Sequence, residues 1–349
     1  MQKVWSISGR SIAVSALALA LTACQSMRGP EPVAQANIPE QGYLTDVSGP
    51  SIAEQGYKDF FADQRLLQVL DLALANNRDL RTSTLNIQRA QQQYQITENN
   101  QLPTIGASGG VLRQDTLSSQ KPITSYNVGL GVTAYELDFW GRVRSLKDNA
   151  LDSYLATSSA RDATQIALIG QVAQAWLNYS FANANLKLAD QTLKAQLESY
   201  NLNKKRFDVG IDSEVPVRQA QISVETARND VANYKTQIAQ AKNLLNLLVG
   251  QQVPENLLPN QRVTRISKSN VVGAGLPSDL LNNRPDIRAA EYKLSAAGAN
   301  IGAAKARMFP TISLTGSAGY ASTDLSDLFK SGAFIWSLGP SLDIPIFDW

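Results

Sequence analysis

The strongest pattern in the chain is a seven-residue repeat of apolar positions between residues 141 and 249. In its first half, the two rows of the repeat are Val172, Tyr179, Leu186, Leu193, Tyr200 and Phe207, and Leu168, Ala175, Ala182 and Ala189. In its second half, they are Val217, Val224, Val231, Ile238 and Leu245, and Ala220, Ala227, Tyr234, Ala241 and Leu248. A strict seven-residue repeat is typical of coiled-coil helices. Because only Val209 to Ser213 separate the halves, we predict an antiparallel helical hairpin over residues 141–249.

The link between the two helices combines turn-forming residues with aliphatic ones. Gly210 is suited to the left-handed conformation that ends a helix, and Asp212 or Ser213 can cap the next helix. Two interpretations of Val209 and Ile211 stay open at this point. They either hold a tight turn together, or they form an exposed docking surface for another coiled coil at the end of a rod.

Shorter segments of the chain alternate between polar and apolar residues. From residue 311 onward, Thr311, Ser313, Thr315 and Ser317 fall on one face, and Ile312, Leu314, Ala318 and Tyr320 fall on the other. A weaker alternation sets Thr104, Gly106 and Ser108 against Ile105, Ala107 and Val111. A second strand follows each segment, one with Tyr126, Val128, Leu130, Val132 and Ala134 on one face, the other spanning residues 335–344. We predict strand pairs over about 102–138 and 309–346, with water on one side and lipid or protein core on the other.

Four strands are too few to close a barrel in a membrane, because open edges leave backbone groups unpaired in lipid. Several chains must then share one barrel, and three copies would supply about twelve strands, enough for a pore. The edge of a soluble sandwich is the alternative. The segment from Gly129 to Ala134 matches a dinucleotide-binding pattern, but no helix opens from it, and we reject that interpretation.

The chain also contains an internal duplication. Pro103-Thr104-Ile105 returns as Pro310-Thr311-Ile312 at a spacing of 207 residues, and Trp140 corresponds to Trp349 at a spacing of 209. A repeat of this kind predicts an architecture built from one duplicated unit. We expect a first repeat over residues 63–273, which includes the hairpin, and an incomplete second repeat over 274–349. A second hairpin is expected beyond Trp349, as in a truncated product or a fragment.

The first residues have the organisation of a bacterial export signal. Lys3 and Arg10 precede a short apolar run, and the segment ends in Leu21-Thr22-Ala23-Cys24, which resembles a lipobox. We expect residues 1–23 to be a signal peptide and Cys24 to carry covalent lipid. Residues 24–62 are expected to form a lipid-anchored tether, since Pro30, Pro32, Pro39 and Pro50 lie in its first part.

Composition argues against enzymatic chemistry and nucleic-acid binding. The chain has no histidine, and its sole cysteine, Cys24, excludes an intramolecular disulfide and a thiolate metal site. The net charge of +2, without a long basic run, provides no footprint for phosphate backbones. Asp324, Asp327, Asp343 and Asp348 show no spacing that enforces a catalytic pair. We therefore expect no catalytic residue, no metal, no nucleic-acid partner and no cofactor other than the lipid on Cys24.

Three segments together resemble the TolC/OprM family of outer-membrane efflux channels, and with the lipobox its lipoprotein branch. They are Arg206 to Ser213 at the hairpin turn, Tyr135 to Gly141 at a strand end, and Asn283 to Glu291. The resemblance implies a mainly helical fold in which a homotrimer shares a 12-stranded barrel in outer-membrane lipid and continues as a helical barrel into the periplasm. It also implies that Val209, Gly210, Ile211 and Asp212 contact a periplasmic adaptor, and that Thr311, Ser313, Thr315 and Ser317 face the lumen.

The expected function is that of a passive exit duct for drugs and small molecules, driven by an inner-membrane pump of the resistance-nodulation-division (RND) class. Two alternatives are an outer-membrane duct for type I protein secretion and a periplasmic coiled-coil adaptor lipoprotein. The paired alternating strands weigh against the adaptor.

Overall fold

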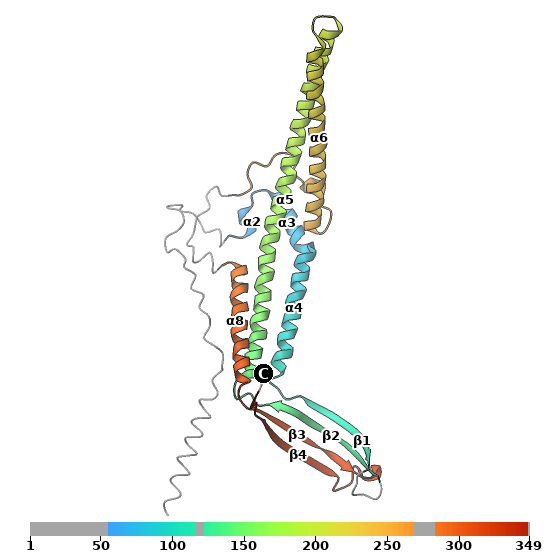
Figure 1. Ribbon diagram of the computed structural model, residues 1–349, viewed down its shortest axis with the longest axis vertical. Helices are drawn as coiled ribbons and strands as arrows, with labels where there is room; N and C mark the ends of the chain where they lie inside the picture. Colours follow the sequence, from blue (N-terminus) through green and yellow to red (C-terminus); the bar gives the residue numbers. More distant parts are fainter. Residues whose placement is uncertain (1–54, 116–121, 269–282, 348–349) are drawn as a thin grey trace, which may run out of the picture. The chain divides into compact units, whose positions relative to one another are not determined.

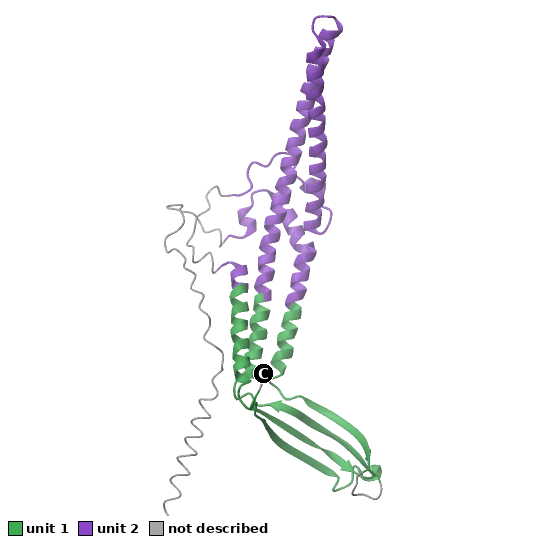
Figure 2. Ribbon diagram, in the orientation of Figure 1, with its two compact units in different colours: residues 1–35, 88–156, 290–349 green, residues 36–87, 157–289 purple. Residues whose placement is uncertain are grey.

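A computed structural model describes residues 55–115, 122–268 and 283–347 of the chain (Figure 1). The expected signal peptide, the lipidation site Cys24 and Trp349 lie outside these residues. The chain divides into two compact units (Figure 2). We call residues 1–35, 88–156 and 290–349 the strand unit, and residues 36–87 and 157–289 the core unit. Both predicted repeats contribute to the strand unit.

The long hairpin is built from two helices, α5 (Arg142–Asp208) and α6 (Glu214–Val249). With 67 residues, α5 measures about 100 Å along its axis. Ala189 shares a small cavity with Ala227, and Ala182 shares another with Ala241. Later residues of α5 therefore lie beside earlier residues of α6, which makes the hairpin antiparallel (Figure 1).

The predicted helix seam is confirmed along most of its length. In α6, Val217, Ala220, Val224, Ala227, Val231 and Leu245 are buried, as are Leu168, Val172, Ala175, Ala182 and Ala189 in α5. The prediction is wrong at Phe207, whose side chain is 42% exposed. Phe207 belongs to the last turn of α5, at the tip end of the hairpin, where Val209, Ile211 and Val215 are exposed as well.

The core unit gathers shorter helices around this hairpin. They are α2 (Tyr57–Phe60), α3 (Gln64–Asn76), the first part of α4 (Arg78–Asn99) and a 3-10 turn η2 (Glu255–Leu257). Leu66 and Leu70 of α3 are fully buried together with Trp176 of α5 and Leu245 of α6. This cluster is a conventional hydrophobic core that excludes water.

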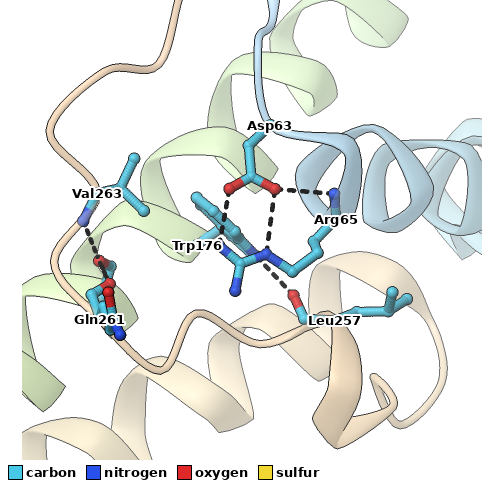
Figure 3. Close-up of polar contacts among 7 residues, drawn as sticks. Asp63, Arg65, Trp176, Leu257, Gln261 and Val263 are labelled. Carbon is cyan, nitrogen blue, oxygen red and sulfur yellow. Dashed lines mark hydrogen bonds and ion pairs between the residues drawn. The ribbon is translucent and has the colours of Figure 1, made fainter.

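The segment from Leu257 to Val263, which follows α6, is held against α5 by hydrogen bonds to buried side chains (Figure 3). The indole N–H of Trp176 donates to the carbonyl of Leu257 at 3.0 Å. The hydroxyl of Ser180 donates to the carbonyl of Gln261 and accepts from the N–H of Val263, both at 3.0 Å. These contacts satisfy polar groups that the core would otherwise leave unpaired.

The strand unit holds an antiparallel sheet in the order β1-β2-β3-β4. The strands are β1 (Ile105–Gln114), β2 (Ile123–Glu136), β3 (Thr311–Ser322) and β4 (Phe334–Asp343), with a 3-10 turn η3 (Leu325–Asp327) between the last two. The prediction of a mainly helical chain with four strands is confirmed. The pairing of β2 with β3 joins the strands of the two repeats into one sheet.

Helix α8 (Pro285–Ala306) precedes β3 and, from residue 290, belongs to the strand unit. Its Ala296 carbonyl accepts from Asn149 at 2.7 Å, and its Ser295 hydroxyl donates to Asp152 at 2.6 Å. These bonds align α8 with the beginning of α5. Among the described residues, none of the helices is both long and apolar enough to cross a bilayer.

Candidate functional site: a two-faced sheet and a hairpin tip

One face of the sheet is lined by hydroxyl groups. Thr311, Ser313, Thr315 and Ser317 lie opposite Asp343, Ser341, Gly339 and Ser337 in that order. The hydroxyls of Ser313 and Ser341 are 2.7 Å apart, as are those of Ser317 and Ser337. The four β3 residues predicted to share a polar face therefore do share one, because side chains two positions apart point the same way.

The other face of β3 and β4 is apolar along its whole length. Its cross-strand pairs are Ile312 with Leu342, Leu314 with Pro340, Gly316 with Leu338, Ala318 with Trp336, and Tyr320 with Phe334. The apolar residues Val128, Leu130 and Val132 of β2 continue this face. The sheet thus separates a surface suited to water from a surface suited to an apolar medium.

A bulge in β2 overturns one predicted position. The register changes between Val132 and Tyr135, so that Tyr135 rather than Ala134 lies opposite Leu314 on the apolar face. Ala134 adopts a positive φ of 49°, which side chains other than glycine rarely adopt. Its N–H donates to the Thr315 hydroxyl at 3.1 Å. Ala134 is therefore the bulged residue, and Thr315 supports the bulge.

Aromatic and charged contacts stabilise the connections between β2 and α5 and between α8 and β3. Trp140 stacks on Phe309, with ring centroids 4.8 Å apart, and its indole N–H donates to the Pro310 carbonyl at 2.7 Å. The carboxylate of Asp138 accepts from the N–H groups of Val143 at 3.0 Å and Arg144 at 2.9 Å, which caps the start of α5. This cap was not among the predicted features, although an Asp near the start of a helix is the usual signal.

The hairpin tip has the geometry that the sequence predicts for its glycine. Gly210 has a φ of 73°, and its N–H donates to the Phe207 carbonyl at 2.9 Å. The N–H of Ile211 donates to the Arg206 carbonyl at 2.9 Å. Ser213 occupies the cap position of α6, but its side chain makes no capping hydrogen bond. Asp212 accepts only from the N–H of Ser213 and pairs with Arg206 at 3.5 Å.

The aliphatic residues of the tip face solvent. Val209 is 69% exposed and Ile211 is 71% exposed, so neither side chain holds the turn together by burial. Val215, the second residue of α6, is 61% exposed. An exposed apolar cluster at the end of a helical hairpin is the kind of surface that partner proteins bind. The role of these residues in contacting an adaptor stays a prediction.

The aspartates near the β3–β4 connection take part in local structure. Asp327 pairs with Lys330 at 2.5 Å, and the N–H of Asp324 donates to the Ser322 hydroxyl at 3.2 Å. Across the part of the chain that the structure describes, His, Cys, Asp and Glu residues form no cluster of three that could hold a metal ion.

Comparisons with known proteins place these features in one family. The family model described as outer membrane efflux protein matches residues 69–251 and 276–349. The chain is 42% identical over 310 residues to the probable efflux pump outer membrane protein TtgC of Pseudomonas putida, covering 87% of this chain and 64% of TtgC. It is 38% identical over 344 residues to the outer membrane protein OprJ of Pseudomonas aeruginosa, covering 96% of this chain and 72% of OprJ.

A solved structure agrees in fold. The open-state crystal structure of the MtrE outer membrane channel of Neisseria gonorrhoeae superposes with a TM-score of 0.81 at 40% identity, covering 90% of this chain and 71% of MtrE. The chain thus spans somewhat less than two thirds of the length of TtgC and more of OprJ and MtrE. Together with the two-faced sheet and the long hairpin, these matches show that the chain belongs to the outer membrane efflux protein family.

Proposed function

We propose that this chain forms part of the wall of an outer-membrane exit duct in an efflux system of the RND type. The observation that carries the proposal is the sheet, with hydroxyls on one face and only apolar or small residues on the other along β3 and β4. Such a sheet suits the boundary between a water-filled passage and lipid. Drugs and other small molecules would pass along the hydroxyl face, and the chain itself would catalyse no reaction.

The proposed assembly is a homotrimer. Strands β1 and β4 each pair on one side only within the described sheet, and their free edges can pair with the edges of other copies. Three copies would contribute about twelve strands, a number compatible with an open pore. Closure in this way would satisfy the backbone groups that an open sheet leaves unpaired in lipid.

The hairpin and the N-terminal region supply the proposed connections. The exposed tip residues Val209 and Ile211, with Gly210 and Asp212 between and beside them, would contact a periplasmic adaptor, which in turn would join an inner-membrane RND pump. Lipid on Cys24 would anchor the chain to the outer membrane, with the hairpin extending into the periplasm. The two-faced sheet favours this duct over a periplasmic adaptor.

The experiment deletes the gene in its own bacterium and restores it with wild-type and variant versions. Deletion should raise the accumulation of a fluorescent drug-like dye, and the wild-type gene should reverse this. A version with Val209→Asp and Ile211→Asp should reach the outer membrane in normal amount but fail to restore efflux, because the charges disrupt an apolar contact. Ile222→Asp is the matched control, since Ile222 is 68% exposed on α6 away from the tip.

Two outcomes would contradict the proposal. Unchanged dye accumulation after deletion would contradict a role in efflux. Equal restoration by the tip variant and by Ile222→Asp would leave a duct in place but contradict the adaptor contact at the tip.

A further inference from the structure

The apolar face of the sheet contains a furrow along β3. Gly316 and Ala318 form its floor, because the large residues on either side belong to the neighbouring strands. Val132 and Leu130 of β2 lie opposite these small residues on one side, and Leu338 and Trp336 of β4 lie opposite them on the other. Leu314 and Tyr320, two positions before and after the floor, stand at its ends. The register thus places the smallest residues between walls of large ones.

This furrow is part of a wider groove of about 580 Å³ on the same face, which also reaches Pro103, Ile105 and Tyr135. None of the side chains that line this groove carries a charge. Ser317 and Ser337 border it only from beneath, since their hydroxyls are bonded across the opposite face at 2.7 Å. The groove therefore offers a long apolar surface without a free hydroxyl to hold water.

Aromatic groups occur at both ends of the face that carries the groove. At one end, Tyr135 lies in the groove lining and donates its hydroxyl to the Gln101 carbonyl at 2.9 Å. At the other end, Tyr320 contacts Phe329 and Phe334, with ring centroids 5.5 Å and 5.7 Å apart. Aromatic residues at the two ends of an apolar strand face mark the boundaries of a bilayer. Lipid chains are then the molecules that meet the groove.

We propose that this groove is a binding site for one acyl chain of a membrane phospholipid, lying along Gly316 and Ala318 between Val132, Leu130, Leu338 and Trp336. The proposal rests on the proposed function, because it needs this face to lie in the membrane. A groove that buries a flexible chain against fixed side chains retains it longer than a flat lipid-facing surface, since more apolar contact is lost when the chain leaves.

Gly316 allows a direct test. A Cβ atom added there would lie 3.4 Å from a methyl of Leu338 and 3.7 Å from the Ser337 carbonyl oxygen, which is ordinary contact. Gly316→Leu should therefore fold and fill the groove. Gly339→Leu is the matched control, because Gly339 lies opposite Thr315 on the hydroxyl face and a Cβ there meets nothing within 4 Å. Ala318→Leu fills the same groove from a second position.

The chain is reconstituted into vesicles of phosphatidylethanolamine and phosphatidylglycerol, floated with them, and extracted into detergent. Native mass spectrometry then counts the phospholipid that each chain retains. We expect wild type and Gly339→Leu to retain one phospholipid per chain, and Gly316→Leu and Ala318→Leu to lose it. Brominated phosphatidylcholine should quench the fluorescence of Trp336 less in Gly316→Leu than in wild type, with Trp336→Phe giving the background.

The possible failures are distinguishable. A chain that does not float with the vesicles contradicts the membrane placement, and with it the proposed function and the groove. A chain that floats but retains equal phospholipid in wild type and Gly316→Leu overturns the groove alone. Retention that is found only after Cys24→Ser would mean that the chain's own acyl group fills the groove, and would also overturn the assignment.

Discussion

The core unit and the sheet of the strand unit are stabilised in different ways. In the core unit, Trp176, Leu66, Leu70 and Leu245 are removed from water almost completely. In the sheet, every residue of β1 and β4 is exposed in the single chain, and the backbone hydrogen bonds between strands hold it together. The core unit therefore carries its own hydrophobic energy, whereas the sheet obtains such energy only from an apolar medium or from other chains.

Two tryptophans provide the strongest test of this difference between the core unit and the sheet. Trp176→Ala should lower the free energy of unfolding by about 3–5 kcal/mol, because it removes a fully buried ring and leaves the Leu257 carbonyl without its donor. Trp336→Ala, at a position 71% exposed on β4, should change it by less than about 0.5 kcal/mol in detergent. Urea unfolding followed by far-ultraviolet circular dichroism measures both. Equal losses of unfolding free energy would contradict the view that the core unit has a hydrophobic core of its own and the sheet does not.

Two serines give a smaller contrast. Ser180→Ala should cost about 1–3 kcal/mol, because Ser180 is buried and the Gln261 carbonyl and the Val263 N–H both lose their partner. Ser317→Ala removes an exposed hydroxyl pair on β3 and should have an effect within about 0.5 kcal/mol. The same urea unfolding measures the two variants. A larger effect of Ser317→Ala would mean that the hydroxyl face stabilises the chain by itself.

Two glycines in the hairpin should respond with opposite signs. Gly210→Ala places a side chain at a φ of 73° and should destabilise the tip by about 1 kcal/mol. Gly170→Ala, in the middle of α5 with nothing within 4 Å of the added Cβ, should stabilise the helix by about 0.5–1 kcal/mol. Hydrogen exchange of the hairpin amides distinguishes the two changes. Destabilisation by both would show that Gly170 has a packing role.

The smallest expected effect is a dependence on pH at the start of α3. The hydrogen bonds from Arg65 hold the pKa of Asp63 below its usual value, and Asp63 also accepts from the Arg65 N–H at 2.8 Å. A lowered folded pKa means that this stability is present above the unfolded value of about 3.9 and is lost as pH falls through the folded pKa. Asp63→Asn should flatten the decline of the urea midpoint below about pH 4. Glu214→Gln, in an exposed pair with Arg218, is the control and should leave the decline unchanged.

Local patterns predicted the elements, and long-range contacts produced what those patterns missed. The heptad positions from Val217 to Leu245 identified the buried seam because the residues that face a partner helix recur every seven positions. The hydroxyl row from Thr311 to Ser317 was predictable for the same reason, with a period of two. Trp176 was not singled out, since its acceptor on Leu257 lies 81 residues away and no periodicity refers to it.

The tip and the lipid site show a different limit. Gly210 was predictable because a positive φ favours glycine, but the exposure of Val209 and Ile211 depends on the three-dimensional path of the link between α5 and α6. The groove over Gly316 depends on which residues of β2 and β4 stand beside it, and that register is a property of the assembled sheet.

The bulge at Ala134 changes the phase of β2. Before it, even-numbered residues such as Leu130 and Val132 point to the apolar side; after it, the odd-numbered Tyr135 does, and Glu136 is free to bond Arg142. One inserted residue thus exchanges the faces to which the odd- and even-numbered side chains of β2 point. Without the bulge, regular pairing of the same residues would place Ala134 opposite Leu314 and turn the Glu136 carboxylate toward the apolar side. A single backbone irregularity therefore keeps a charge out of the apolar layer at the point where the strand gives way to the helix.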